Sequence, residues 1–286
     1  MSVALISPGA WNFANYLHKI LECDYYPSNL CVRADVGILY GVFISQRDFL
    51  TPLKKCSRRI GVWVGTDVLQ LQALAAAKPE AIELINAFFN VRLADAPNLK
   101  VELEALGVVV DGIVETPPRI VFESMPLPEI FTVGIYQPKH RPDFYNLDFC
   151  LDVAKAMPDV EFRLYGLNRE FSQISDNVWD LGWINMEEEM PHLSASMRFV
   201  QHDGLGLGVI EYLMAGRRAI TNQDIEMATK TEMKIENVVE QLRAWQKEKK
   251  SNKEASSYWR DRINHEKFKS AIEGWYSPSI YPDAGL

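Results

Sequence analysis

Short apolar runs alternate with longer segments of helical periodicity along most of the chain, and this alternation restricts the fold more than any other feature of the sequence. The first apolar run, 2–6, stops at Ser7-Pro8-Gly9, and a helical pattern covers 13–21. Further segments of both kinds follow: strands are predicted at 36–43, 60–64, 91–94 and 108–114, and helices at 67–88 and 98–106. Strands that alternate with helices predict parallel sheets with helices on both faces.

A proline-rich stretch divides this pattern into two halves. Thr116-Pro117-Pro118 is followed by Pro126 and Pro128, which is typical of a linker between domains. Beyond it the alternation resumes, with strands predicted at 131–136, 160–165, 178–181, 198–201 and 218–221 and helices at 147–157, 186–193 and 208–215. We therefore expect an α/β chain of two doubly wound, Rossmann-like domains, 1–125 and 126–230. They are expected to face a central cleft at the carboxyl ends of their strands.

Composition and charge narrow the class of protein. The chain has 286 residues and a formal net charge of −8, so it has no global attraction for nucleic acid or for anionic membranes. Its four cysteines have no metal-ligand spacing, and no apolar run reaches the roughly 18 residues of a membrane span. We expect a cytoplasmic protein without a bound metal. The basic run 54–59 and the tryptophan-containing C-terminal helices leave peripheral contact with a membrane or an anionic acceptor open.

The segment 199–211 carries the most chemical information, because it predicts a strand, a glycine-rich turn and a helix in succession. Gly204, Gly206 and Gly208 let the backbone approach a ligand and leave amides free at a helix N-terminus, which attracts phosphate. Asp203 and Glu211 flank these glycines, and carboxylates bind the vicinal hydroxyls of a ribose or a hexose. A phosphate between hydroxyls is the shape of a nucleotide-sugar. A tight turn with two solvated acids is the alternative.

This segment and the residues up to Ile220 resemble the donor-site motif of GT-B glycosyltransferases, closest to the retaining family 4 type, in which seven residues separate two acids. Segment 131–136 resembles the strand that opens the donor domain of that family, and 162–166 is similar to its second strand. The segment 181–193 resembles the part of the family that lies near the nucleobase. The resemblance thus covers about 131–221, and it implies that the C-terminal helices, 231–286, pack back across both domains.

The resemblance implies a role for each matching position. Glu211 would hold the ribose hydroxyls, and Asp203 would hold sugar hydroxyls and act as a catalytic residue at the anomeric centre. The remaining donor-binding positions are Gly204, Leu205, Gly206 and Leu207 at the diphosphate or sugar, and Gly182, Trp183 and Ile184 at the base.

Three positions depart from the family pattern in the donor half. Position 203 is Asp where Glu is usual, so its side chain is one methylene shorter. The family neutralises the diphosphate with an Arg and a Lys, but Ile135 and Asn146 stand near those places here. Lys139 and Arg141 are therefore the predicted substitutes.

In the first half, 61–67 resembles the acceptor-side "W-x-G-T-D" segment of the family. Asp67 is predicted as a second catalytic residue, or equally as the cap of the following helix. Many members have a sugar-contacting His where this chain has Val64. The other predicted acceptor-side residues are Pro8, Gly9, Trp63, Gly65 and Thr66.

The expected function is transfer of a sugar from a nucleotide-sugar, a UDP- or GDP-sugar, with retention and with no metal or other cofactor. The acceptor stays open among a glycan, a lipid-linked intermediate, a small molecule and a modified nucleobase. Two alternatives remain. One is a catalytically degenerate GT-B module that binds a nucleotide or a protein partner, which Val64 and Ile135 favour. The other is a nucleotide-sugar epimerase.

Overall fold

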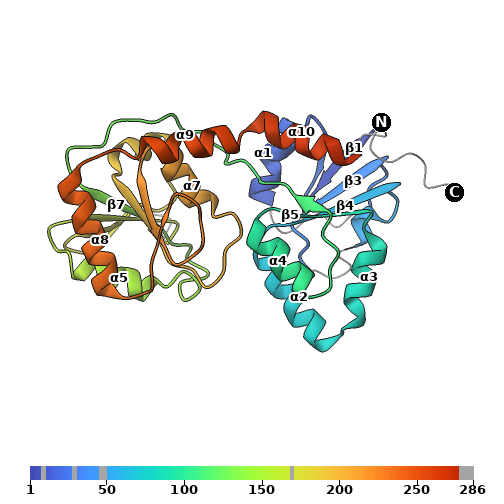
Figure 1. Ribbon diagram of the computed structural model, residues 1–286, viewed down its shortest axis with the longest axis horizontal. Helices are drawn as coiled ribbons and strands as arrows, with labels where there is room; N and C mark the ends of the chain where they lie inside the picture. Colours follow the sequence, from blue (N-terminus) through green and yellow to red (C-terminus); the bar gives the residue numbers. More distant parts are fainter. Residues whose placement is uncertain (8–10, 28–30, 45–49, 168–170, 277–286) are drawn as a thin grey trace. The chain divides into compact units, whose positions relative to one another are not determined.

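The structure is a computed structural model that describes residues 1–7, 11–27, 31–44, 50–167 and 171–276. The predicted acceptor-side residues Pro8 and Gly9 lie outside these ranges. The chain divides into two compact units, drawn in Figure 1: the first contains Met1–Arg119 and the segment from Ile263, and the second contains Ile120–Arg262. The sequence placed the first boundary at 125 and grouped all the terminal helices together, whereas here these helices are shared between the two units.

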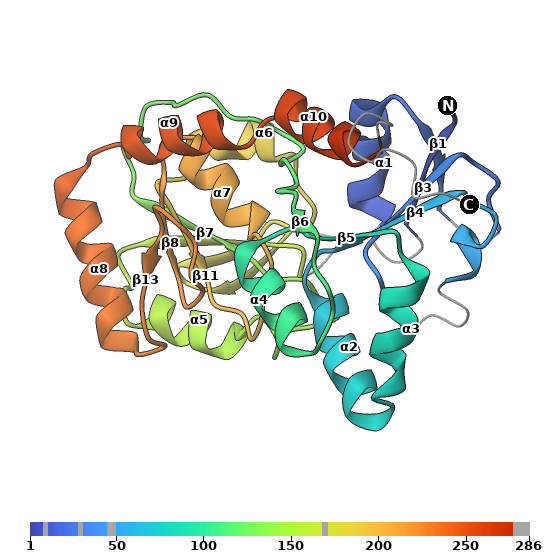
Figure 2. The ribbon, with the colours of Figure 1, turned by 45° about the vertical axis from the view of Figure 1, so that its right-hand side comes forward.

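The first unit is built on a six-stranded, fully parallel sheet. Its strands, in the order in which they pair, are β2 (Asp24–Tyr26), β1 (Val3–Ile6), β3 (Val36–Tyr40), β4 (Arg58–Trp63), β5 (Val91–Ala94) and β6 (Gly112–Ile113). Helices α1 (Trp11–Leu21) and α10 (His265–Tyr276) cover one face, and α2 (Thr66–Ala77), α3 (Glu80–Phe88) and α4 (Pro97–Ala105) cover the other, as Figures 1 and 2 show. A short 3-10 helix, Thr51–Leu53, precedes β4.

Two predicted elements of this unit are shorter or broken. The single helix expected at 67–88 is two helices, because Pro79 follows Lys78 and removes the amide that a continuous helix would need there. The strand expected at 108–114 pairs only at Gly112–Ile113, so most of that apolar segment is an extended connection.

The second unit is built on a seven-stranded sheet. Its strands, in pairing order, are β13 (Thr229–Lys230), β12 (Arg218–Thr221), β11 (Ala195–Arg198), β7 (Thr132–Tyr136), β8 (Glu161–Tyr165), β10 (Val178–Asp180) and β9 (Ser172–Ser175). All neighbours are parallel except β9 and β10. Helices α5 (Leu147–Lys155) and α8 (Ile235–Glu248) lie together on one face, and α7 (Leu207–Met214) and α9 (Lys253–Arg262) on the other (Figure 2). The short helices Met186–Glu189 (α6) and Met190–His192 follow β10.

Strand β11 begins three residues earlier than the sequence predicted, at Ala195 rather than at 198. The apolar pair Phe199-Val200 favoured the later start, and Ser196 and Arg198 made the real strand look polar. The shift has a consequence for the site, because Arg198 becomes the last residue of the strand and lies at the carboxyl edge of the sheet.

In each sheet, the order in which successive strands are added reverses once. In the second unit the chain proceeds from β7 to β8 and β10 on one side, and then returns to β11, β12 and β13 on the other. The change therefore falls between β7 and β11, and the corresponding change in the first unit falls between β1 and β3. Ligands of open α/β sheets bind outside the carboxyl ends of the strands at such points. The expectation of an α/β chain with parallel, doubly wound sheets is confirmed.

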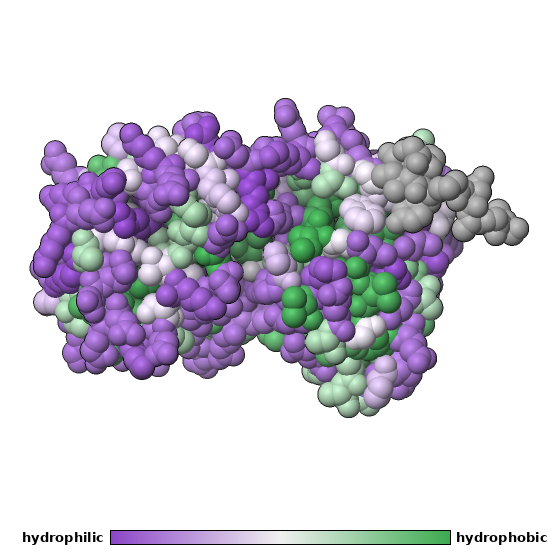
Figure 3. Space-filling view, viewed as in Figure 1, coloured by the Kyte–Doolittle hydropathy of each residue, from purple (hydrophilic) through white to green (hydrophobic). Residues whose placement is uncertain are grey.

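The surface of the first unit carries several large apolar side chains. Figure 3 shows apolar residues over the helices of this unit, among mostly hydrophilic ones. Those with high exposure in this unit include Leu84, Val101 and Val109. Within the described ranges, no helix is both long and apolar enough to cross a membrane.

Candidate active site

The carboxyl ends of β7 and β11 support the candidate site. Hydrogen bonds tie the loop after β7 to the loop after β11. The Gln201 backbone amide donates to the Phe144 carbonyl at 3.0 Å, Gln201 Nε2 to the Asp143 carbonyl at 3.3 Å, and Asn146 Nδ2 to the Phe199 carbonyl at 3.3 Å. Because backbone carbonyls accept all of these bonds, the two loops are held in a defined relation at the point where the strand order reverses. Side chains from both loops therefore converge over this edge of the sheet.

The glycine turn leads directly into α7. Gly206 has φ 68°, in the left-handed region that strains other residues, and a Cβ there would also lie 2.5 Å from Ile225 Cδ1, so glycine is strongly favoured at this position. Gly208 is exposed in the first turn of α7, and apart from its chain neighbours and the backbone of its own helix, no described atom lies within 4 Å of the place that its Cβ would occupy. The N-terminal turn of α7 is thus open on that side, where a ligand can approach the backbone closely.

Asp203 forms an ion pair with Arg198, with 2.7 Å between Oδ2 and Nε. The two side chains are only 16% and 13% exposed. The Arg198 guanidinium also lies over the ring of Tyr145 at 5.1 Å and near that of Tyr136 at 6.0 Å. Burial opposes its charge, but the attraction and hydrogen bond of Asp203 outweigh this effect and raise the pKa of Arg198. A permanent positive charge is therefore fixed beside Asp203.

Sequence reasoning missed Arg198. The signal that could have found it is its place inside the strand Ala195–Arg198, whose other residues are all buried. A cation at the end of a buried strand needs a partner or a ligand.

An aromatic surface continues from this cation across the end of β7. Tyr136 is 38% exposed and Trp183, after β10, is 66% exposed, with 6.5 Å between their ring centroids. Two exposed aromatic rings side by side offer a flat apolar face on which a planar ligand group can stack. Gly182, beside Trp183, accepts the amide of Gly166 at 2.8 Å, so the loops after β8 and β10 are also tied together. Ile184 is half-buried in the same loop.

The remaining donor-side positions have distinct settings. Glu211 lies in the second turn of α7 and is half-buried, Gly204 and Leu207 are half-buried, and Leu205 is buried in the turn. Lys139 is exposed in the loop after β7, where its amide donates to the Gly166 carbonyl. The guanidinium of Arg141 stacks on the Phe144 ring at 3.9 Å.

In the first unit, Asp67 is completely buried, which is at odds with contact between its carboxylate and a substrate. Its carboxylate accepts hydrogen bonds from the backbone amides of Val42 at 2.9 Å, Val64 at 3.1 Å, Gly65 at 2.9 Å and Val68 at 3.0 Å. Burial raises the pKa of Asp67 to about 6, although the four amides act in the opposite direction. The side chain ties the ends of β3 and β4 to the start of α2.

Trp63 was also expected on the acceptor side, but its side chain is completely buried in the core and packs edge-on against Phe89 at 5.5 Å. A strand buried on both faces carries its large side chains away from solvent, so the aromatic residue signalled packing. Gly65 is the buried residue that precedes α2, and Thr66, its first residue, is half-buried.

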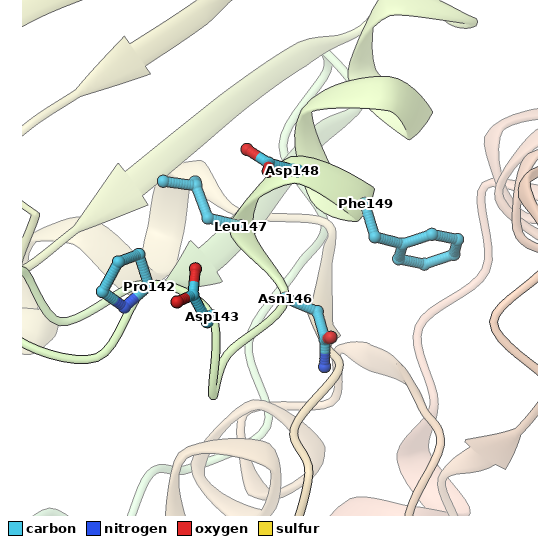
Figure 4. A pocket seen from close by; sticks show the side chains of 6 residues that line it. All are labelled: Pro142, Asp143, Asn146, Leu147, Asp148 and Phe149. Atoms are coloured by element: carbon cyan, nitrogen blue, oxygen red, sulfur yellow. The ribbon is translucent and has the colours of Figure 1, made fainter.

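A hollow of about 240 Å³ lies at the start of α5, and Figure 4 shows the side chains that line it. Asp143 in the preceding loop and Asp148 in the first turn of the helix contribute carboxylates to it. Two carboxylates in a small hollow disfavour phosphate, so we do not assign the donor to it.

No family model matches the chain, and no curated protein matches its sequence. Solved structures do match. Sucrose-phosphate synthase from Thermosynechococcus elongatus is 10% identical, with a TM-score of 0.68 over 96% of this chain and 98% of that one. Anabaena HepE in complex with UDP and glucose is 12% identical, with a TM-score of 0.66 over 93% and 82% of the two chains. The lipopolysaccharide outer core galactosyltransferase WaaB is 14% identical, with a TM-score of 0.64 over 96% and 100%.

Longer proteins also match over part of their length. This chain spans 53% of TarM and 59% of the pneumococcal O-GlcNAc transferase GtfA. At these identities the likeness is one of fold: the chain has the GT-B fold, as the sequence predicted.

Proposed function

We propose that this chain is a glycosyltransferase whose second unit binds a nucleotide-sugar and whose first unit binds the acceptor. The observation that carries the proposal is the convergence of Asp203, Arg198 and the open first turn of α7 at the point where the strand order reverses. Anions bind at helix N-termini, and nucleotides bind at such points in doubly wound sheets.

The side chains and backbone amides at this edge offer a complementary group to each part of a nucleotide-sugar. The exposed rings of Trp183 and Tyr136 suit the base and the ribose of a nucleotide. The amides at the start of α7 suit the diphosphate, and the carboxylates of Asp203 and Glu211 suit sugar and ribose hydroxyls. Apolar, anionic and hydroxyl-rich parts of one ligand would thus each meet a complementary group.

The chemistry follows from this placement. When the bond between the sugar and the phosphate breaks, positive charge develops on the sugar and negative charge on the diphosphate. Preorganised amides at the N-terminus of α7 stabilise the leaving diphosphate, and the Asp203 carboxylate stabilises the sugar. The leaving phosphate can take the proton of the acceptor hydroxyl, which is compatible with retention and needs no metal. Asp67 then acts as a positioning residue of the first unit.

Among the possible donors we favour a UDP-sugar. HepE was solved with UDP and glucose, and GtfA with UDP and GlcNAc. For the acceptor we favour a glycan, because WaaB is a lipopolysaccharide outer core galactosyltransferase.

The test measures binding and turnover separately. Thermal melting and calorimetry of the full chain against UDP, GDP, ADP and their glucose, galactose and GlcNAc conjugates should identify one nucleotide that raises the Tm. Release of the nucleoside diphosphate from the matching sugar donor is then measured with a panel of glycan acceptors.

The informative variant is Glu211→Gln, which should weaken nucleotide binding without loss of folding. The matched control is Glu248→Gln, which removes a carboxylate from α8 whose partner is Arg218. Absence of a Tm shift with every nucleotide at millimolar concentration would contradict the proposal.

One observation favours the alternative of a binding module without catalysis. Two residues expected to line the acceptor side, Trp63 and Asp67, are core residues. Nucleotide binding without transfer to any acceptor, together with no slow hydrolysis of the donor, is the outcome that this alternative predicts.

A further inference from the structure

We propose that Arg198 is the cation that binds the diphosphate of the donor, and that Asp203 holds the place of that diphosphate until the donor arrives. This inference rests on the proposed function. The leaving diphosphate needs a positive charge beside it, and this inference places that charge on strand β11. The sequence had pointed instead to Lys139 and Arg141, in the loop after β7.

The position of Arg198 is the first argument. It ends β11, the strand that pairs with β7 across the reversal of strand order, and the glycine turn begins five residues later. The guanidinium therefore lies at the edge where the amides of α7 begin. Lys139 is exposed and Arg141 stacks on Phe144, so neither is held toward this edge by a carboxylate among the contacts described.

The second argument is preorganisation. Asp203 binds the Arg198 guanidinium at one side, and the rings of Tyr145 and Tyr136 lie against it. A hydrogen bond with Tyr145 also supports the charged form. A guanidinium fixed by aromatic faces loses little freedom when it binds an oxyanion, and its planar fork matches phosphate oxygens.

The third argument concerns charge balance. An arginine whose side chain is only 13% exposed requires an anion near its guanidinium, and without a ligand Asp203 supplies it. A diphosphate brings at least two negative charges and takes over this task. The Asp203 carboxylate is then released for the hydroxyls of the sugar. Asp203 starts the turn that contains Gly204 and Gly206, so a change in its side-chain direction stays local.

This arrangement predicts that Arg198 and Asp203 have opposite effects on the affinity for a nucleoside diphosphate that carries no sugar. Removing the guanidinium should weaken the binding of UDP. Removing the carboxylate charge that competes for the guanidinium should strengthen the binding of UDP. A purely structural ion pair gives no such opposition, because loss of either partner would disturb the site in the same sense.

The experiment is calorimetric titration of UDP, uridine and UDP-glucose into the wild type and variants of the full chain. If the wild type binds GDP instead, GDP, guanosine and GDP-glucose replace them. For Arg198→Met we expect at least about tenfold weaker binding of the diphosphate and unchanged binding of the nucleoside. For Asp203→Asn we expect several-fold tighter binding of the diphosphate and a smaller gain, or a loss, for the sugar conjugate. Arg163→Met is the matched control, since it removes an ion-paired arginine from mid-strand in β8 and should change none of these constants.

Each variant is first checked by its Tm. If Arg198→Met does not fold, Arg198→Lys and the double variant Arg198→Met with Asp203→Asn replace it. The lysine should recover part of the affinity for the diphosphate, and the neutral double variant should fold and bind it as weakly as expected for the single one.

If the folded variants that lack the Arg198 charge, Arg198→Met or its double variant with Asp203→Asn, bind the diphosphate as tightly as the wild type, the assignment of Arg198 is overturned. The proposed function would still stand. Unchanged or weaker binding of the diphosphate by Asp203→Asn overturns the role of Asp203 as its placeholder. A wild-type protein that binds no nucleotide overturns the proposed function, and this inference with it.

Discussion

The phenolic oxygens of Tyr165 and Tyr212 lie 2.9 Å apart in the core of the second unit, and both press against the backbone of Gly134. Tyr165 ends β8, Tyr212 belongs to α7, and Gly134 is the central residue of β7. The pair thus sets the distance between the sheet and the helix whose first turn is proposed to bind phosphate.

Gly134→Ala should therefore destabilise the second unit strongly. The new Cβ would lie 1.8 Å from the Tyr212 oxygen and 2.2 Å from the Tyr165 oxygen, so α7 or the sheet must move. We expect a loss of about 2 kcal/mol or more in urea unfolding monitored by tryptophan fluorescence. An unfolding midpoint equal to that of the wild type would show that the close approach is relieved without displacement of α7.

Gly208→Ala should separate stability from binding. No described atom lies near the added methyl group, and alanine favours a helix over glycine, so the free energy of unfolding should stay the same or rise by up to about 1 kcal/mol. The methyl group projects from the first turn of α7, where we place the donor, so nucleotide affinity should fall. Gly206→Ala is the contrasting variant, because it collides with Ile225 and should lose stability as well. Full nucleotide affinity in Gly208→Ala would argue against a ligand at this turn.

Trp183→Ala should weaken nucleotide binding and leave folding intact. The side chain is largely exposed, so little buried area is lost, but the proposed surface for the base disappears. Phe171→Ala is the matched control: Phe171 is equally exposed and stacks on Trp179 at 5.5 Å. Fluorescence titration with the nucleotide should distinguish the two variants, and equal affinities in both would remove Trp183 from the site.

Asp67→Asn should destabilise the first unit. An amide keeps one acceptor but turns an NH₂ group toward backbone amides that need acceptors, in a site with no access to water. We expect a loss of roughly 2–3 kcal/mol in the free energy of unfolding. Nucleotide affinity of the folded fraction should be unchanged, because Asp67 and the donor site belong to different units. A stable Asp67→Asn protein that binds the donor and transfers no sugar would restore the catalytic role.

The four cysteines should differ widely in their reactivity. Burial raises the pKa of Cys150 to about 12 and that of Cys23 to about 11, and Cys56 is buried with its pKa raised as well. Cys31 is exposed. At pH 8 only about one thousandth of Cys23 is thiolate, so iodoacetamide should label Cys31 first. Mass spectrometry of timed digests measures the order, and all four should react at similar rates in urea. Early labelling of Cys150 would contradict the packing of α5.

Apolar periodicity was sufficient to predict the class of the fold. Buried parallel strands are nearly continuous apolar runs, so β1, β3, β5, β7 and β8 were found close to their true positions. The strands that were missed lack such runs and lie at the edges of their sheets: β2 has three residues, β9 is Ser172–Ser175, mostly polar and exposed, and β13 has two residues. Their pairing depends on neighbours that sequence periodicity does not report.

The sequence predicted part of the candidate site, and the parts that it found and missed have different physical causes. The motif located the glycine turn and Asp203, because glycine spacing reports a backbone requirement directly. It could not locate the partner of Asp203, since the pairing with Arg198 depends on where β11 starts. The same motif logic placed Trp63 and Asp67 at a surface, although both are buried on β4 and at its end. Residue type reports which chemistry is available, and burial decides whether a ligand can reach it.

The return of the chain to its first unit at Ile263 has a consequence for biosynthesis. Phe268, Ile272 and Tyr276 of α10 complete the core that Leu5, Ile38 and the other strand residues begin. The second unit, in contrast, is one uninterrupted stretch, Ile120–Arg262. On the ribosome, domains usually finish in the order in which they are translated. Here the unit that emerges first stays incomplete until the second has been synthesised and α10 has emerged.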